Sequence, residues 1–327
     1  MNAIRVDLDR GGTTESRHLV AGVVHEPASG RTRSFGNREV TAFWRSSMKP
    51  FQALPMTRAG TLERLGLGPE ALALACASHH GMRRHVALAR SILDQAGLGE
   101  DALVCGPHRP FDPGAAERLD LAGRLPGRIH NNCSGQHAAL LALTVARGWS
   151  VAGYHEPDHP LQRDIRRELD AWLGIDCGPL PWGIDGCGLP TPALPLREMA
   201  RAYARFANSE EAPVRAVAAA MTTHPMFVSG PTALSANIMR ATSGRVLAKE
   251  GAEGLFCLGS PAAGWGAAFK VLDGATRPLG PAVVHALSTL DLLAPEEAGR
   301  LRAFARPSVS NTRGERVGVL MVVDDGG

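Results

Sequence analysis

The sequence predicts an α+β protein, in which strands from both ends of the chain form one antiparallel sheet and helices fill the middle. Residues 19–27 are apolar and β-branched, and the turn-forming segment 28–32 follows them, so strands and turns are expected near the N-terminus. Towards the other end, the segments 254–259, 266–274 and 316–325 have the same strand-like composition. Between these regions, apolar residues recur at helical spacing instead.

The middle of the chain divides into helices at its glycines, prolines and capping residues. The segment 128–149 is apolar around most of its circumference, which predicts a buried helix capped by the Asn and Ser residues at its start. Residues 181–196 are punctuated by Gly and Pro and are expected to form a loop. No repeat, low-complexity tract or long linker occurs, which favours a single domain over residues 1–327. Further helices are expected at 54–66, 85–99, 160–175, 196–208 and around 214–225.

Composition and charge exclude several classes of protein. A hydrophobic content of 44% and a charged content of 20% are globular values, and the net charge of +3 is spread along the chain without a compact basic stripe, which argues against nucleic-acid binding. No apolar run approaches the roughly 20 residues of a membrane span. The first residues lack the apolar core of a signal peptide, and the six cysteines form no CxxC pair, so reduced thiols and a cytoplasmic location are expected.

Lysine is rare in this chain, since only three of the 35 Lys and Arg residues are Lys. Lys49 follows Ser46 by three positions in the sequence RSSMKP, so both side chains are expected on one face of a helical turn. A neutral lysine can take the proton of a serine hydroxyl, whereas arginine stays protonated and cannot. The stretch therefore predicts either a nucleophile with its base or an ordinary turn with a surface lysine.

The other two lysines differ in their surroundings. Lys270 follows a run of small residues that brings the backbone close to another segment, and it lies in an apolar, strand-like sequence. It is expected to be partly buried, either as a functional amine or as an edge lysine that extends to solvent. Lys249 is flanked by Glu250 and Glu253 and is expected at the surface.

Polar and sulfur-bearing side chains follow buried segments at further places. The apolar residues 72–77 lead directly into Ser78 and His79, where either a helix cap or a site at the edge of the core is expected. Cys187 lies on the glycine-rich segment 181–196, and Cys133 precedes the predicted buried helix. The two cysteines are expected either to bind a soft metal ion, if the fold brings them together, or to be simple buried thiols.

Taken in order along the chain, these stretches resemble one known family. The sequence is similar to the Rhizobium-type L-asparaginase II family over roughly residues 7–327. That resemblance implies a fold like that of serine β-lactamases and β-lactamase-like glutaminases, a homodimer, and hydrolysis of L-asparagine to aspartate and ammonia. The stretches are RGGTTESRH, RSSMKPFQALP, ACASHHG, HNNCSGQHAALLAL, GYHEPDHPLQ, GIDGCGLPTPALPL, HPMFVSG and the glycine-rich approach to Lys270.

The resemblance also implies roles for particular residues. Two Ser–Lys pairs would be catalytic, Ser46 with Lys49 and Ser78 with Lys270. The residues implied to bind the substrate are Arg45, His79, Asn131, His137 and Asp185.

A zinc ion is held in that family by two cysteines and a lysine. The corresponding positions here are Cys133, Gln136 and Cys187, so glutamine stands where the family has lysine. His80 and Met82 also depart from the family's pattern beside Ser78. A glutamine oxygen is a neutral ligand of a poorer kind than an amine, so these departures bear on zinc binding and on the identity of the substrate.

The resulting hypothesis is an amidohydrolase that works by acyl transfer. A serine attacks the side-chain amide while a neutral lysine accepts its proton, and two neighbouring lysines are expected to lower each other's pKa. Arg45 would pair with the substrate α-carboxylate. One alternative is an amidase or acyltransferase with a specialised substrate, and another is an inactive relative that binds amino acids. The expected partner is a small amide, with neither nucleic acid nor membrane.

Overall fold

The computed structural model describes residues 1–323, and the chain divides into two compact units. The first unit consists of residues 1–47 and 194–208 together with the chain from residue 237 onward. The second unit consists of residues 48–193 and 209–236. The single domain that the sequence predicts over residues 1–327 stays a prediction. No helix in the described part of the chain has the length and apolar character that crossing a bilayer requires.

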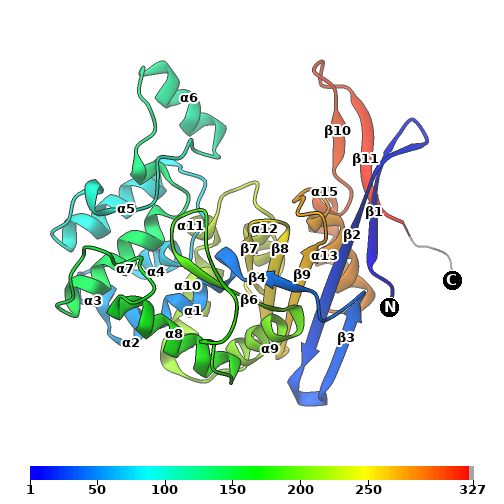
Figure 1. Cartoon of the computed structure of the whole chain (residues 1–327). Coiled ribbons are helices and arrows are strands. Elements are labelled where there is room, and N and C mark those ends of the chain that lie inside the picture. The colour runs from blue at the N-terminus through cyan, green and yellow to red at the C-terminus, as the bar shows by residue number, and fades with distance from the viewer. Residues whose placement is uncertain (324–327) are drawn as a thin grey trace. The chain divides into compact units, whose positions relative to one another are not determined.

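The first unit contains a sheet that joins the two ends of the chain (Figure 1). Among residues 1–323, eight strands form it in the order β10-β11-β1-β2-β9-β8-β7, with β3 paired to β2, and the pairings are antiparallel. The predicted α+β class with shared terminal strands is therefore confirmed. The strands are β1 Ile4–Arg10, β2 Thr13–Glu26, β3 Arg31–Phe35, β7 Leu247–Gly251, β8 Leu255–Ser260, β9 Trp265–Val271, β10 Ser308–Ser310 and β11 Arg316–Val322, and the unit also includes β4 Thr41–Phe43.

The helix α9, Leu196–Ala207, packs against β2, β8 and β9 of this sheet. Its approach to β9 is close at Gly266, where an added Cβ would lie 2.1 Å from the backbone nitrogen of Ala204 and 2.3 Å from the oxygen of Ala200. The run of small residues before Lys270 therefore admits a helix backbone, which is the close approach that the sequence predicts. The other helices of the unit are α13 Leu279–Thr289, α14 Pro295–Arg300 and α15 Arg302–Ala305.

The second unit is helical and is built around α7, Ser134–Ala146. Its residues from Ser134 to Thr144 are all buried, with α4 and α5 packed against them, so the predicted buried helix is confirmed. The remaining helices are α1 Lys49–Gln52, α2 Leu54–Arg58, α3 Thr61–Arg64, α4 Pro69–Ala75, α5 Arg83–Gln95, α6 Pro113–Leu121, α8 Pro160–Leu173, α10 Ala212–Thr223 and α11 Pro225–Val228, while α12 Leu234–Ala241 runs from this unit into the first.

Several local expectations are corrected by the structure. Residue Cys133 is the N-cap of α7 and makes no side-chain capping bond, so the Asn and Ser residues do not cap this helix. The predicted loop over 181–196 contains a short hairpin of β5, Trp182–Ile184, and β6, Pro190–Pro195, which pair antiparallel. The predicted helix over 54–66 is divided into α2 and α3 at Ala59 and Gly60, where Gly60 has a positive φ of 57°.

Two further corrections concern Lys249 and the last strand. Lys249 lies in β7 with no exposed surface, because four of the five residues of this strand are buried and only Glu250 is partly exposed. The ammonium group instead donates to the backbone oxygen of Glu250 at 2.8 Å. The strand predicted over 316–325 is β11, and Asp324 and Asp325 lie outside the described residues.

Replacing Gly266 by Ala is expected to destabilise the protein by about 1–3 kcal/mol, because the new methyl group meets backbone atoms of α9 that cannot rotate away. Urea unfolding at neutral pH measures this change. The control is Gly299→Ala on α14, where a Cβ meets nothing within 4 Å and helix propensity favours alanine. Equal stability of the two variants would contradict the close packing of α9 on β9.

Candidate active site

Lys49 is the most deeply buried amine of the second unit, with an exposed fraction of 1%. It begins α1, and Pro50 follows in the first helical turn, where its missing N–H leaves no hydrogen bond unmade. The Lys49 Nζ atom donates to Ser78 Oγ at 3.1 Å, to Cys133 Sγ at 3.0 Å and to the backbone oxygen of Ala77. The structure thus places a lysine amine against a serine hydroxyl and a thiol inside the unit.

The segment that carries Ser78 is held by backbone bonds rather than by regular structure. It follows α4, and the backbone nitrogen of Ser78 donates to the oxygen of Val228 at 3.0 Å. The next nitrogen, of His79, donates to the oxygen of Asn132 at 2.8 Å, directly before Cys133. The segment is not a helix cap, and its bonds to two distant parts of the unit fix Ser78 beside Lys49.

Charge at the cluster is concentrated on Lys49 and Cys133. The hydrogen bond from Cys187 lowers the pKa of Cys133 to about 6, and the nearby Lys49 contributes in the same direction although burial opposes it. The pKa of Cys187 is raised, first by that same hydrogen bond and then by its own burial. The pair of thiols therefore carries one negative charge, located on Cys133.

Burial lowers the pKa of Lys49, but the charges of Cys133, Cys187 and Asp185 and the hydrogen bond to Cys133 together outweigh it, and the net pKa lies above the ordinary lysine value. Lys49 is therefore an ammonium group paired with a thiolate at neutral pH. This differs from the hypothesis that Lys49 is held uncharged. An ammonium can donate a hydrogen bond to Ser78, but it cannot accept a proton until it loses one itself.

Lys270 lies on β9 in the first unit and is half-buried, as its sequence predicts. Burial lowers the pKa of Lys270 below the ordinary lysine value. Its Nζ atom donates to the backbone oxygen of Val271. Because Ser78 belongs to the other unit, the pairing of Ser78 with Lys270 stays a prediction.

The first unit also holds Arg45 and Ser46, in a 3₁₀ turn over residues 45–48. Arg45 has a positive φ of 51°, a strained backbone conformation for a residue with a side chain, and such strain concentrates at functional sites. The turn is anchored through Ser47, whose hydroxyl donates to the oxygen of Lys249 at 3.0 Å and whose own oxygen accepts from Tyr203 Oη at 2.6 Å.

Two of the predicted substrate-binding residues are engaged with the protein itself. His79 has no exposed surface, accepts at Nδ1 from the nitrogen of Gly81 at 3.1 Å, and lies 3.0 Å through Nε2 from Ser134 Oγ. Asn131 donates to the oxygen of Gly106 at 2.8 Å and accepts from the nitrogen of Cys133 at 2.8 Å. In this structure both side chains shape the backbone around the cluster.

His137 and Asp185 are placed differently. His137 is buried on α7, and its Nδ1 lies 2.6 Å from Tyr154 Oη, while its Nε2 has no hydrogen-bond partner in the described chain. Burial lowers the pKa of His137 to about 3, so the ring is neutral and can donate one hydrogen bond. Asp185 lies on the turn between β5 and β6 and accepts from the nitrogen of Gly186 at 2.7 Å.

Sequence reasoning missed three residues that hold the site in place. Tyr154 bonds His137, and Gln52 bonds Gln136, since Gln136 Nε2 donates to Gln52 Oε1 at 2.6 Å. Tyr203 anchors the turn that carries Ser46. Gln52 follows Lys49 by three positions, a spacing that could have indicated a shared helix face. No local pattern marks the two tyrosines.

The three donors implied for zinc do not fit a closed zinc site. Cys133 and Cys187 are hydrogen-bonded to each other, but Cys133 also accepts a hydrogen bond from the ammonium of Lys49. The third donor is a neutral amide already bonded to Gln52. The usual zinc ligands in proteins are cysteine sulfur, histidine nitrogen and carboxylate oxygen, and residues 1–323 contain no cluster of three or more His, Cys, Asp or Glu side chains able to hold a metal ion.

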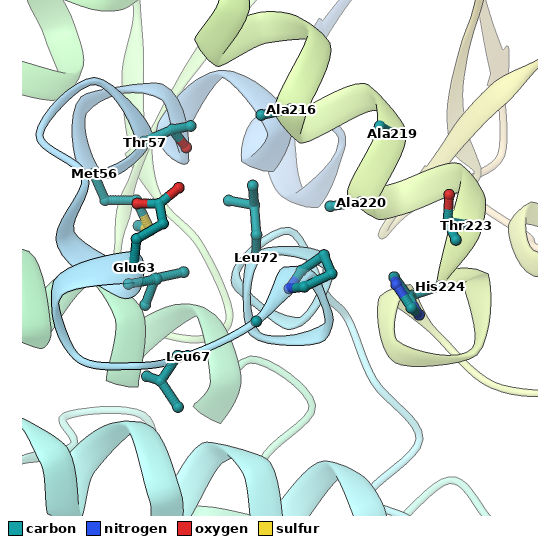
Figure 2. A pocket seen from close by; sticks show the side chains of 13 residues that line it. Met56, Thr57, Glu63, Leu67, Leu72, Ala216, Ala219, Ala220, Thr223 and His224 are labelled. Atoms are coloured by element: carbon teal, nitrogen blue, oxygen red, sulfur yellow. The ribbon is translucent and has the colours of Figure 1, made fainter.

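A separate cavity of about 380 Å³ lies among α2, α3, α4 and α10 of the second unit. Figure 2 shows Thr57 and Glu63 at one end of it and Thr223 and His224 at the other. The walls between them are apolar, and none of the predicted site residues lines the cavity. It is therefore distinct from the cluster around Lys49.

Comparison with known proteins identifies the class first. A model of the L-asparaginase II family matches residues 6–322. The chain therefore belongs to the L-asparaginase II family, which groups it with the amidohydrolases. No curated protein sequence matches it significantly.

Similar solved structures include two glutaminases and a β-lactamase-like protein. The Bacillus subtilis glutaminase YbgJ, in covalent complex with 5-oxo-L-norleucine, is 13% identical with a TM-score of 0.37, covering 84% of this chain and 87% of that one. A probable B. subtilis glutaminase complexed with 6-diazo-5-oxo-L-norleucine is 14% identical, with a TM-score of 0.37 and 84% of each chain covered. A putative β-lactamase from Bacteroides dorei is 14% identical, with a TM-score of 0.42, covering 81% and 92%. Such loose superpositions carry no argument about the reaction.

The buried histidine His85, whose ring centroid lies 5.1 Å from that of His79, predicts a pH dependence of stability. Burial lowers the pKa of His85 to about 4, and its Nε2 lies 2.6 Å from the oxygen of Met226. The unfolded chain binds a proton below about pH 6.5 and the folded chain does not until about pH 4, so stability is lost as pH falls through that window, by about 3 kcal/mol in total.

Urea unfolding between pH 7 and pH 4 tests this, comparing wild type with His85→Gln. The variant should lose stability less steeply as the pH falls, by about 1.4 kcal/mol per pH unit. The control is Ser150→Ala at an exposed position, which removes no titratable group and should keep the wild-type slope. Identical slopes for wild type and His85→Gln would contradict this prediction, because they would show that the folded and unfolded chains protonate His85 at the same pH.

Proposed function

We propose that this protein hydrolyses the side-chain amide of L-asparagine to aspartate and ammonia through an acyl-enzyme formed on a serine. The observation that carries the proposal is the buried amine of Lys49 within hydrogen-bond distance of Ser78 Oγ, in a chain of the L-asparaginase II family. A lysine amine within hydrogen-bond distance of a serine hydroxyl can orient that hydroxyl for nucleophilic attack. The implied homodimer and the cytoplasmic location stay predictions.

The charge states of the two lysines suggest separate tasks for them. Lys49 is an ammonium group and is suited to orient Ser78 and to donate a proton. Burial shifts the pKa of Lys270 downward, which is the direction that favours a base, so Lys270 is the amine assigned to remove the proton of the attacking hydroxyl. Ser46 is the second candidate nucleophile, and the choice between the two serines is left to experiment.

In the acylation step, the serine oxygen bonds to the amide carbon and its proton passes to the neutral lysine. The carbonyl oxygen becomes an oxyanion, which backbone N–H groups and the Lys49 ammonium would stabilise. When the tetrahedral species collapses, the C–N bond breaks and the nitrogen leaves as ammonia with the transferred proton. Water then attacks the ester, releases the aspartate side-chain carboxyl group and restores the serine hydroxyl. Arg45 would bind the substrate α-carboxylate.

Lys49→Met and Lys270→Met are each expected to lower kcat for ammonia release by about 10²–10⁴-fold, because each removes a group that moves or orients a proton. Ammonia release from L-asparagine measures this, with circular dichroism to confirm that the variants fold. The control is Ser150→Ala, at an exposed position remote in sequence from both lysines. A variant of either lysine with near-normal turnover would contradict its role in proton transfer.

A specialised amidase is the second candidate, and the departures at His80 and Met82 favour testing it. His80 packs its ring against Phe111, with ring centroids 5.9 Å apart, so this side chain contributes a surface that the family's pattern lacks. A panel of L-asparagine, L-glutamine and simple amides and esters separates the two candidates. The asparaginase proposal expects the highest kcat/KM for asparagine, and a higher value for another amide would replace it with the specialised amidase.

A further inference from the structure

Two contacts of the same spacing join α1 to the start of α7. Lys49 bonds Cys133, and three positions further along both segments Gln52 bonds Gln136. Residues three apart lie on one face of a helix. The two hydrogen bonds therefore join one face of α1 to the start of α7. The Gln52–Gln136 bond fixes the alignment of the two segments in which Lys49 meets Cys133.

The Gln52–Gln136 bond joins two buried side-chain amides, since Gln52 is 2% and Gln136 1% exposed. Gln52 Nε2 and Gln136 Oε1 have no hydrogen-bond partner in the described chain. Rotating both side-chain amides by 180° keeps the hydrogen bond, whereas rotating only one would bring two nitrogens or two oxygens together. In either arrangement the pair keeps one spare donor and one spare acceptor, so its polarity suits a neutral group such as a water molecule better than a cation.

We propose that the hydrogen bond between Gln52 and Gln136 positions Lys49 against Ser78 and Cys133. The same bond occupies the Gln136 side chain, so Gln136 does not bind a metal ion, and Cys133 and Cys187 hold no resident zinc. The proposal rests on the proposed function where it concerns catalysis, because Lys49 is assigned there as a proton donor. Its metal part is independent of any activity. Gln52 and Gln136 are positioning residues, since they act through Lys49.

The contacts around Cys133 support this assignment. The Lys49 amine donates a hydrogen bond to Cys133 Sγ at 3.0 Å, so a protein donor already occupies this side of the sulfur. A zinc ion would have to enter beside this amine with two sulfur ligands and one neutral amide. Loss of a single ligand typically leaves a zinc site weak, because the metal normally needs at least three protein donors.

The metal part is tested by zinc content after purification without chelators and by zinc titration against a competing chromogenic chelator. The wild type is expected to contain no stoichiometric zinc. Gln136→Glu supplies a carboxylate as third ligand and should bind zinc about tenfold tighter or more. The control Gln95→Glu makes the same change at an exposed position of α5 and should not change zinc affinity. A wild-type protein that holds about one equivalent of zinc, lost in Gln136→Leu, would overturn the proposal.

The positioning part is tested by a double-mutant cycle. Gln52→Leu and Gln136→Leu each leave one buried amide without its partner, and each should lower kcat about tenfold with KM nearly unchanged. The double variant should be no slower than either single variant, because the two changes remove the same bond. Losses that multiply in the double variant, or variants that lose melting temperature but keep kcat, would overturn the positioning role. If wild type itself shows no turnover of any amide, the proposed function fails while the zinc result still stands.

Discussion

The arrangement of the second unit depends on one interaction, the buried ammonium of Lys49 with the thiolate of Cys133. An unpaired amine at this depth would lose its charge or destabilise the fold, because desolvation of an isolated ion is very costly. The thiolate offsets that cost and keeps Lys49 charged, which in turn allows it to bond Ser78. Local structure holds the pair in place, because Lys49 begins α1, backbone bonds hold Ser78, and Cys133 is the N-cap of the buried helix α7.

This pairing also divides the work between the two unusual lysines. Lys49 is surrounded by groups that stabilise its positive charge. Burial has the largest effect on the pKa of Lys270, on the sheet of the first unit, and lowers it. In the proposed mechanism Lys49 is the proton donor and Lys270 the proton acceptor, and the opposite directions of their pKa shifts support that assignment.

Much of the fold could be predicted from the sequence because its signals are local. Apolar, β-branched segments at both ends predicted the shared sheet, and the largely apolar segment 128–149 predicted the buried helix. Lys249 was misplaced because its flanking glutamates suggest a surface, while its burial depends on the packing of the edge strand β7 against residues distant along the chain, such as Ser47. The hairpin within 181–196 was missed because β5 has only three residues and β6 is rich in proline.

The candidate site was only partly predictable for the same reason. The rarity of lysine indicated Lys49 and Lys270, but the partner that decides the charge of Lys49 lies 84 residues away along the chain. The Gln52–Gln136 bond spans the same separation of 84 residues, and its importance appears only when α1 and α7 are seen together. Long-range contacts of this kind set pKa values, and residue types alone do not.

The central claim is that Lys49 is charged and Lys270 is the amine that loses its proton more readily. Because the chain contains three lysines, labelling their side chains with ¹⁵N should give three signals, which Lys49→Met and Lys270→Met assign. A titration followed by nuclear magnetic resonance should show Lys49 protonated throughout the neutral and mildly alkaline range, with Lys270 losing its proton first. A Lys49 signal that becomes neutral at lower pH than that of Lys270 would contradict the account.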